Sequence, residues 1–293
     1  MNKMKIKSIL TIIVLFLYTI AYAQESQVFE TRTLTSRILK TERKYAIYLP
    51  PDYNTTDISY PVLYLLHGSG DDQTGWVQFG QVRHIADKAI AEGICAPMII
   101  VMPDANTGVR GYLNTIDGKF DFENFFFDEL IPHIEKNYRI RTDRRYRAVS
   151  GLSMGGGGTI EYTLHRPDLF AAAAPLSAAT GTWNFEKFKS DIKKKYSDIS
   201  DEKIESYYKN HDIESILKNA SEEKLSQIKS VRWYISCGDD DFLYEGNSLM
   251  HICFKKNNIP HEYRVKDGGH TWTYWRMELP IVLEFVSKSF TQY

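Results

Sequence analysis

Residues 151–158, which read GLSMGGGG, constrain the fold more than any other part of this sequence. They follow residues 147–150, which we expect to form a short buried strand, and we expect residues 154–164 to form a helix. Glycine inside a helix costs roughly 1 kcal/mol relative to alanine, so four in succession must meet a specific steric need. Ser153 occupies the centre of a G-x-S-x-G pattern, which is typical of a sharp strand-to-helix turn that exposes a serine hydroxyl.

The glycines on either side of this serine have a steric explanation. In so tight a turn, side chains two positions before and two positions after the serine would collide with each other or with neighbouring strands, and Gly151 and Gly155 avoid this. The following helix N-terminus favours negative charge beside Ser153. Ser150 has no glycine two positions before or two positions after it and is the weaker candidate for a reactive serine.

Short apolar runs alternate with segments of helical periodicity along the chain. We expect strands over 28–39, 44–49, 62–66, 98–102, 147–150, 170–176, 231–236 and 263–265, and helices over 82–91, 122–138, 154–164, 247–256 and 277–289. The first two strands should be antiparallel to each other. The alternation predicts the α/β class, with a mostly parallel central sheet and helices on both faces.

The segment 186–229 differs from the rest in composition. It holds ten lysines and ten acidic residues, with apolar residues at helical spacing. It predicts a solvated helical excursion between two strands of the sheet, either a cap over a site or a plain insertion. About 45 residues make a poor core alone, so a separate domain is disfavoured.

The N-terminus is typical of a secretory signal peptide. Three lysines and no acid precede an apolar run at 9–23, which ends in the small-residue pattern Ala21-Tyr22-Ala23. We expect cleavage after Ala23, a single domain over 24–293, and a secreted or periplasmic protein without a stable membrane span. The alternative, an uncleaved anchor, needs about 20 apolar residues, and this run is shorter.

Charge and cysteine content exclude some classes of partner. The chain carries a net charge of −1, and removal of the three leader lysines leaves about −4, which disfavours nucleic-acid binding. The three cysteines, Cys95, Cys237 and Cys253, cannot all pair within one chain and are expected to be buried apolar residues. Nothing in the sequence indicates a metal site or a cofactor.

A serine hydroxyl needs a base to become a good nucleophile, and the base needs an orienting acid. Of the five histidines that follow Ser153, only His270 stands in a glycine-containing loop directly after a predicted strand, so we expect it to be the base. The acid should follow an earlier strand, where Asp239, Asp240 and Asp241 are adjacent, and spacing does not choose among them. Asp267 is a further candidate that suits a turn better.

An oxyanion hole needs two backbone N–H groups aimed at the reacting carbonyl oxygen. One should belong to Met154, the residue after the serine, and the loop 65–70 after an early strand fits the other. His67 in that loop is better interpreted as a residue that braces the loop than as a second base.

Five stretches, LLHGSGDDQTGW, ENFFFDELIPHIEKNYRI, GLSMGGGG, CGDDDFL and GGHTWTYWR, resemble the successive signatures of the esterase D-like family. They are most similar to the secreted feruloyl and acetyl-xylan esterases of carbohydrate esterase family 1. The resemblance covers residues 45–285 and is weakest over 186–229. It implies an α/β-hydrolase fold, Asp241 as the acid of the triad, and the N–H of Ser69 as the first oxyanion donor.

The resemblance further implies a secreted serine esterase that needs no cofactor and hydrolyses feruloyl or acetyl esters of plant cell-wall polysaccharides through an acyl-enzyme. Four tryptophans are candidates for stacking on sugar or phenolic rings, although such residues more commonly pack in cores or loops: Trp76, Trp183, Trp272 and Trp275. Three alternatives stay open. They are a siderophore esterase acting on a catecholate trilactone, an S-formylglutathione hydrolase-like thioesterase, and a carbohydrate-binding protein without catalysis. The leader disfavours the second, and the intact triad disfavours the third.

Overall fold

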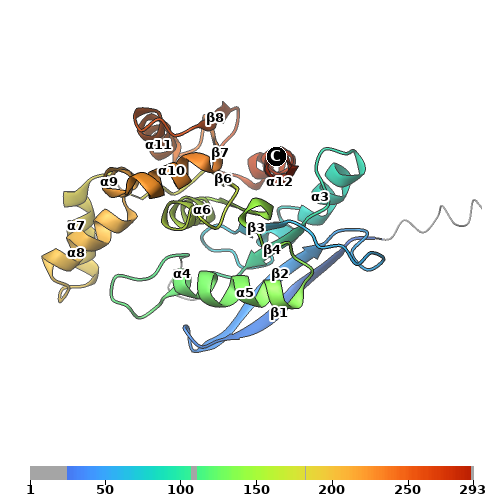
Figure 1. Cartoon of the computed structure of the whole chain (residues 1–293). Coiled ribbons are helices and arrows are strands. Elements are labelled where there is room, and N and C mark those ends of the chain that lie inside the picture. Colours follow the sequence, from blue (N-terminus) through green and yellow to red (C-terminus); the bar gives the residue numbers. More distant parts are fainter. Residues whose placement is uncertain (1–24, 107–110, 182, 292–293) are drawn as a thin grey trace, which may run out of the picture.

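The structure, a computed structural model, describes residues 25–106, 111–181 and 183–291 (Figure 1). Eight strands form one sheet in the order β1-β2-β4-β3-β5-β6-β7-β8. They are β1 (Gln27–Ser36), β2 (Thr41–Leu49), β3 (Val62–Leu66), β4 (Ile99–Pro103), β5 (Arg147–Leu152), β6 (Ala172–Leu176), β7 (Arg232–Gly238) and β8 (His261–Lys266). The β1–β2 and β2–β4 pairs are antiparallel and all other pairs are parallel. This confirms the predicted α/β class with a mostly parallel sheet.

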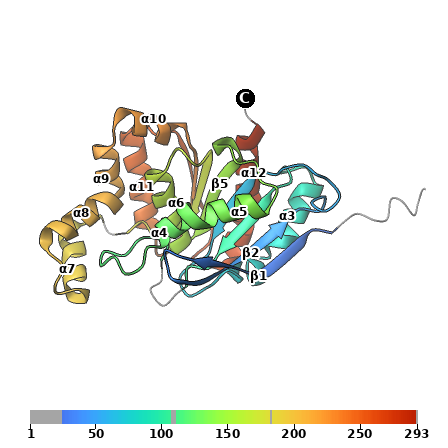
Figure 2. The same cartoon turned by 60° about the horizontal axis from the view of Figure 1, so that its bottom comes forward.

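Side chains of the central strands point alternately into two hydrophobic cores, because successive residues of a strand face opposite sides of the sheet. In β3, Val62, Tyr64 and Leu66 belong to one core and Leu63 and Leu65 to the other. The second core is covered by α3 (Val82–Ala91) and α12 (Trp272–Thr291), and the first by α5 (Ile131–Asn137), α6 (Met154–His165) and α11 (Tyr244–Lys256). Figure 2 shows α5 and α6 in front of the sheet and α12 behind it, so helices lie on both faces as predicted.

The helix predicted over 122–138 is interrupted in the structure. It consists of α4 (Phe122–Phe125), a π-helical turn over Phe126–Leu130, and α5. Pro132 near the start of α5 has no N–H to donate to the carbonyl four residues earlier, and a π turn accommodates this missing hydrogen bond. Two short elements were not predicted, α2 (Gly75–Gln78) and a 3₁₀ turn over Arg144–Tyr146.

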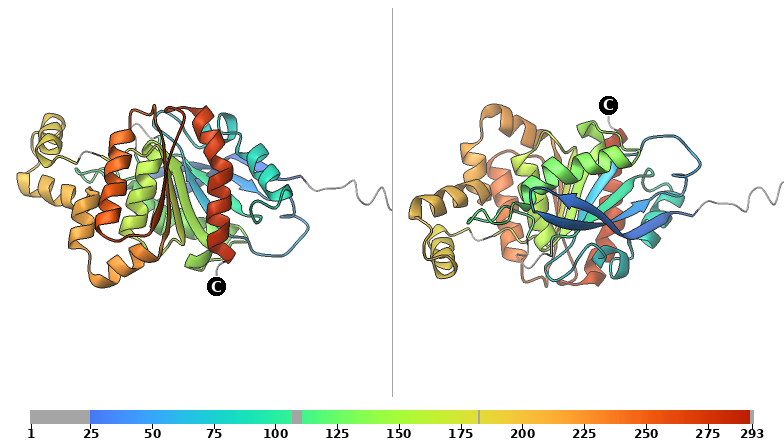
Figure 3. Two further views of the ribbon diagram at one scale, coloured as in Figure 1. Left: turned by 90° about the horizontal axis from the view of Figure 1, so that it is seen from above. Right: turned by 90° about the horizontal axis from the view of Figure 1, so that it is seen from below.

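The charged segment forms the predicted helical excursion, which consists of α7 (Phe185–Lys195), α8 (Asp201–His211), α9 (Ile213–Asn219) and α10 (Glu222–Ser230). Each helix begins after a polar residue whose side chain accepts a hydrogen bond from a backbone N–H three residues on: Asn184, Ser200, Asp212 and Ser221. Figure 3 shows α7 and α8 projecting at the end of the molecule opposite β1 and β2.

The three cysteines are free and buried, as predicted. Burial raises the pKa of the Cys95 and Cys237 thiols to about 12, so both are protonated and unreactive at neutral pH. The expected signal peptide, residues 1–23, lies outside the described residues. Among the described residues, no helix combines the length and the apolar character that a membrane span requires.

Candidate active site

Ser153 lies in the turn between β5 and α6, with backbone angles of φ 54° and ψ −116°. A non-glycine residue in such a conformation costs on the order of 1–3 kcal/mol, which the surrounding packing must offset. A Cβ atom at Gly151 would lie 2.6 Å from the backbone of Gly155, and one at Gly155 would lie 2.5 Å from the carbonyl oxygen of Leu66. The two glycines are therefore needed for the steric reason that the sequence indicated.

The structure brings Ser153, His270 and Asp241 together in a chain of hydrogen bonds. His270 Nε2 lies 2.9 Å from Ser153 Oγ, and His270 Nδ1 lies 2.9 and 3.0 Å from the two carboxylate oxygens of Asp241. Because an ionised carboxylate only accepts hydrogen bonds, Nδ1 carries the proton and Nε2 presents its lone pair to the serine hydroxyl. This is the arrangement that activates a serine.

Burial separates the three adjacent aspartates that the sequence left open. Asp241 is 1% exposed, whereas the side chains of Asp239 and Asp240 are exposed to solvent. Asp239 accepts a hydrogen bond from the Gly268 N–H at 3.0 Å and so braces the loop that carries His270. The fourth candidate, Asp267, is also exposed.

A second serine holds the carboxylate of Asp241. Burial alone would raise the pKa of Asp241, but hydrogen bonds from His270, from the Leu243 N–H and from the Ser177 hydroxyl outweigh burial and hold it below its usual value. The Ser177 oxygen in turn accepts a hydrogen bond from Trp275 Nε1 at 3.0 Å. Sequence reasoning missed Ser177, since a serine after a strand carries no motif. Its φ of 45° is visible only in the structure.

Replacing Ser177 by alanine is expected to lower kcat by about tenfold, the equivalent of 1.4 kcal/mol in barrier, because the Ser177 hydroxyl helps to hold Asp241 in its ionised form. KM should stay unchanged, since Ser177 supports only the acid. Steady-state kinetics checks this, with Ser236→Ala as the control. Ser236 is also buried, but its hydroxyl bonds Tyr274 and not Asp241. Equal kinetics in both variants would remove this role from Ser177.

The loop after β3 passes directly beside the serine. A Cβ atom at Gly68 would lie 2.5 Å from Leu152 and 3.6 Å from the Cβ of Ser153, so this backbone runs alongside the elbow with Ser69 next in the chain. His67 braces the loop, because its Nδ1 lies 2.8 Å from the Gly68 carbonyl and its Nε2 accepts the Ala105 N–H at 2.9 Å. Burial lowers the pKa of His67, which keeps it neutral.

The four candidate tryptophans mostly serve packing. Trp76 is fully buried and donates to the Leu66 carbonyl, and Trp275 is 5% exposed. Trp272 packs edge-on against Trp76, with ring centroids 5.2 Å apart. Trp183 is partly buried and donates to Thr180. The aromatic ring that sequence reasoning missed is Phe242, which is 70% exposed and lies 4.4 Å from the His270 ring.

A cavity of about 350 Å³ is lined in part by Met154, the residue after the serine. Its lining includes the apolar or aromatic side chains of Leu113, Ile116, Phe120, Met154, Ile192 and Tyr196. The excursion supplies part of this wall through Ile192 in α7, Tyr196 directly after α7, and Tyr207 in α8. The excursion, called the cap below, therefore forms part of the wall of this cavity.

Two groups among the described residues bring three potential metal-binding side chains within 4.8 Å of one another. One consists of Glu161, His165 and His211, and the other of the exposed Asp239, Asp240 and Asp267. Neither includes a member of the Ser153–His270–Asp241 chain.

Comparisons with known proteins agree with this geometry. The chain is 40% identical over 157 residues to an endo-1,4-beta-xylanase/feruloyl esterase of Xylanibacter ruminicola, which covers 51% of this chain but only 21% of that longer relative. It is 25% identical over 235 residues to an acetyl esterase of Caldicellulosiruptor saccharolyticus, with 77% and 83% covered. The solved structure of a ferulic acid esterase superposes with a TM-score of 0.79 at 35% identity, covering 91% of this chain and 99% of that one.

These similarities confirm the α/β-hydrolase fold and the predicted family resemblance. The esterase family model, described as "Putative esterase", matches residues 36–285. Since this stretch spans nearly the whole described structure, the chain belongs to the esterase family.

Proposed function

We propose that this chain is a serine carboxylic ester hydrolase in which Ser153 is the nucleophile, His270 the general base and Asp241 the orienting acid. The observation that carries the proposal is the hydrogen-bonded chain from Ser153 Oγ through the His270 ring to the buried Asp241 carboxylate. The esterase family and the strained serine between two obligatory glycines support it.

In the first half-reaction, His270 Nε2 accepts the hydroxyl proton while Ser153 Oγ attacks the ester carbonyl carbon. Asp241 stabilises the resulting imidazolium, and the N–H groups of Ser69 and Met154 bind the oxyanion of the tetrahedral intermediate. His270 then donates the proton to the leaving alcohol oxygen, and an acyl-enzyme remains on Ser153. In the second half-reaction, His270 deprotonates a water molecule that attacks the acyl carbonyl carbon. The resulting tetrahedral intermediate collapses, His270 returns the proton to Ser153 Oγ, and the carboxylic acid is released.

The substrates that we propose are feruloyl or acetyl esters of plant cell-wall polysaccharides. Relatives named as a xylanase/feruloyl esterase, an acetyl esterase and a ferulic acid esterase support this class. The cavity of about 350 Å³ beside Met154, with its aromatic and apolar lining, has room for a phenolic acyl group and favours feruloyl over acetyl.

A panel of four substrates tests the proposal: methyl ferulate, acetylated xylan, a catecholate trilactone and S-formylglutathione. We expect kcat/KM to be highest for methyl ferulate, because its single phenolic acyl group suits the size and apolar lining of the cavity, whereas acetyl and formyl groups leave most of it unfilled. The highest value on the trilactone would instead indicate a siderophore esterase, and the highest on S-formylglutathione a thioesterase. Binding of xylan without hydrolysis of any member would indicate a carbohydrate-binding protein.

We propose that residues 1–23 direct export, so that a single domain over 24–293 meets its polysaccharide substrate in the periplasm or outside the cell. N-terminal sequencing of protein recovered from the native host is expected to begin at Gln24. Protein that starts at Met1 in the membrane fraction would favour the uncleaved anchor.

A further inference from the structure

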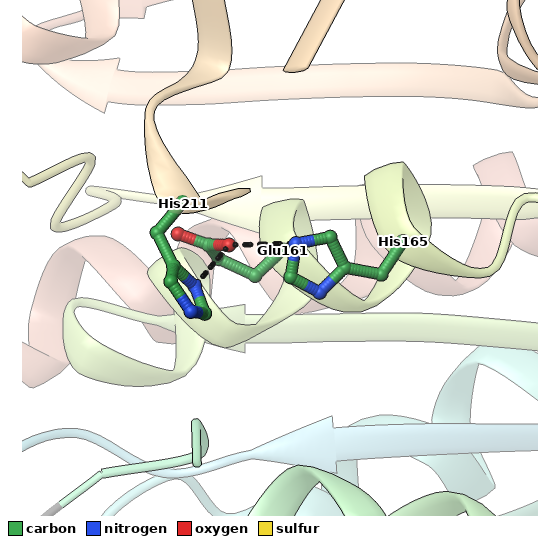
Figure 4. Close-up of side chains that lie close together, drawn as sticks. All are labelled: Glu161, His165 and His211. Carbon is green, nitrogen blue, oxygen red and sulfur yellow. Dashed lines mark hydrogen bonds and ion pairs between the residues drawn. The ribbon is translucent and has the colours of Figure 1, made fainter. Parts of the chain in front are cut away.

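Three side chains outside the proposed active site converge on one point (Figure 4). Glu161 and His165 lie one turn apart on α6, so they project from the same face of that helix. His211 is the last residue of α8, in the excursion. The cluster therefore joins the cap to the helix whose first turn carries the nucleophile.

The separations between these side chains fit a metal coordination shell. Glu161 Oε2 lies 3.4 Å from His165 Nε2 and 3.1 Å from His211 Nδ1. In a tetrahedral zinc site, bonds of about 2.1 Å place the ligand atoms about 3.4 Å from one another. Without an ion, Glu161 Oε2 and His211 Nδ1 are also within hydrogen-bond distance of each other. Two histidines and one carboxylate are also a ligand set that zinc enzymes use.

A carboxylate accepts a hydrogen bond from the ring nitrogen of His165 that faces away from the other two side chains, as is usual for histidines that bind zinc. Glu123, from α4, lies 2.6 Å from His165 Nδ1. This hydrogen bond holds the Nδ1 proton, so Nε2 is the ring nitrogen that faces Glu161 Oε2 and the Asn210 carbonyl oxygen. Glu123 therefore orients one ligand without being a ligand itself.

A metal ion can reach the cluster from solvent. A cavity of about 900 Å³ between α6 and the excursion is lined by Glu123, His165 and His211, and the side chains of His165 and His211 are 20% and 15% exposed. The carbonyl oxygen of Asn210 lies 2.7 Å from His165 Nε2, so a further oxygen atom is present beside the cluster.

A proton competes with a metal ion for the Nε2 atom of His165. Burial alone would lower the pKa of His165, but the hydrogen bond and charge of Glu123, the charge of Glu161 and the Asn210 carbonyl together outweigh burial and raise the pKa to about 9. Metal binding must therefore release the proton that Nε2 otherwise donates to Asn210.

We propose that Glu161, His165 and His211 bind a divalent transition-metal ion, with Zn²⁺ the best fit, and that this ion fixes the cap to the hydrolase body. The ion has no part in ester hydrolysis. Its structural effect reaches the acyl cavity because the Tyr207 ring packs 4.1 Å from the His211 ring, and Tyr207 and Glu161 both line that cavity.

Titration of chelator-treated protein with Zn²⁺ in a calorimeter tests the site. We expect one ion per chain and a rise in Tm on binding. His211→Ala and Glu161→Gln should each weaken binding by at least 100-fold, and Glu123→Gln by 10- to 100-fold. Ca²⁺, which prefers oxygen ligands, should not bind at this site.

His251→Ala is the matched control, because His251 and His261 form a second close pair of histidines, 2.7 Å apart, away from this cluster. It should bind Zn²⁺ as the wild type does. Absence of stoichiometric binding, or equal affinity in His211→Ala and wild type, overturns the proposal and leaves an ion-pair cluster. If the ligand variants do not fold, the visible spectrum of Co²⁺ added to the wild type decides, since tetrahedral nitrogen and oxygen ligation differs from hydrated Co²⁺. Every readout is independent of ester hydrolysis.

Discussion

Replacing Ser153 by alanine is expected to abolish ester hydrolysis, with a loss in kcat on the order of 10⁶-fold, as when the nucleophile of such a triad is removed. Alanine leaves no oxygen to attack the carbonyl, and His270 has no hydroxyl to deprotonate. Tm should change little, because among the described residues the serine hydroxyl bonds only His270, and the alanine variant keeps the same backbone strain. Turnover of methyl ferulate and a calorimetric melting curve measure both effects.

Ser150→Ala is the control for that variant. The Ser150 hydroxyl is fully buried in β5 and donates to the Ala174 carbonyl at 2.6 Å, so its removal should cost about 1 kcal/mol in stability and leave kcat intact. An inactive Ser150→Ala together with an active Ser153→Ala would instead identify Ser150 as the nucleophile.

The parts of the fold that local sequence dictates were predicted well. Strand 62–66 and helix 82–91 have the predicted bounds. In each of them the local pattern, a continuous apolar run or a helical period, indicates the type of secondary structure by itself. The start of α12 was placed five residues late, since its first turn is a run of aromatic residues from the histidine loop without helical periodicity. The position of β4 between β2 and β3 depends on long-range pairing and carries no local signal.

In the candidate site too, features set by local sequence could be predicted and features set by long-range contacts could not. The roles of Ser153 and His270 could be predicted from local sequence, because a nucleophile in a sharp turn and a base in a loop after a strand each require glycines nearby in the chain. The choice among Asp239, Asp240 and Asp241 needed the family resemblance, because the three differ only in burial. The cluster in the cap escaped prediction because His211 is 46 residues beyond its partner His165 and joins it only through the docking of α8 onto α6.

Replacing Asp241, the proposed acid of the triad, is expected to have the second largest effect on kcat. Asp241→Asn is expected to lower kcat by about 10⁴-fold at nearly unchanged Tm. The amide that replaces the carboxylate can donate toward His270 Nδ1, which favours the ring tautomer with the proton on Nε2. That nitrogen then cannot accept the proton of Ser153, and no negative charge stabilises an imidazolium. Steady-state kinetics with methyl ferulate measures the loss.

Asp239→Asn and Asp240→Asn are the matched controls, because they make the same chemical change two positions and one position away. Both side chains are exposed, and an asparagine at 239 still accepts the Gly268 N–H. Each should keep kcat within about tenfold of the wild type, the equivalent of 1.4 kcal/mol in barrier. The opposite result would be loss of activity in Asp239→Asn or Asp240→Asn while Asp241→Asn stays active. Catalysis would then survive without the Asp241 carboxylate that His270 contacts in the structure, so Asp241 would not be the acid of the triad.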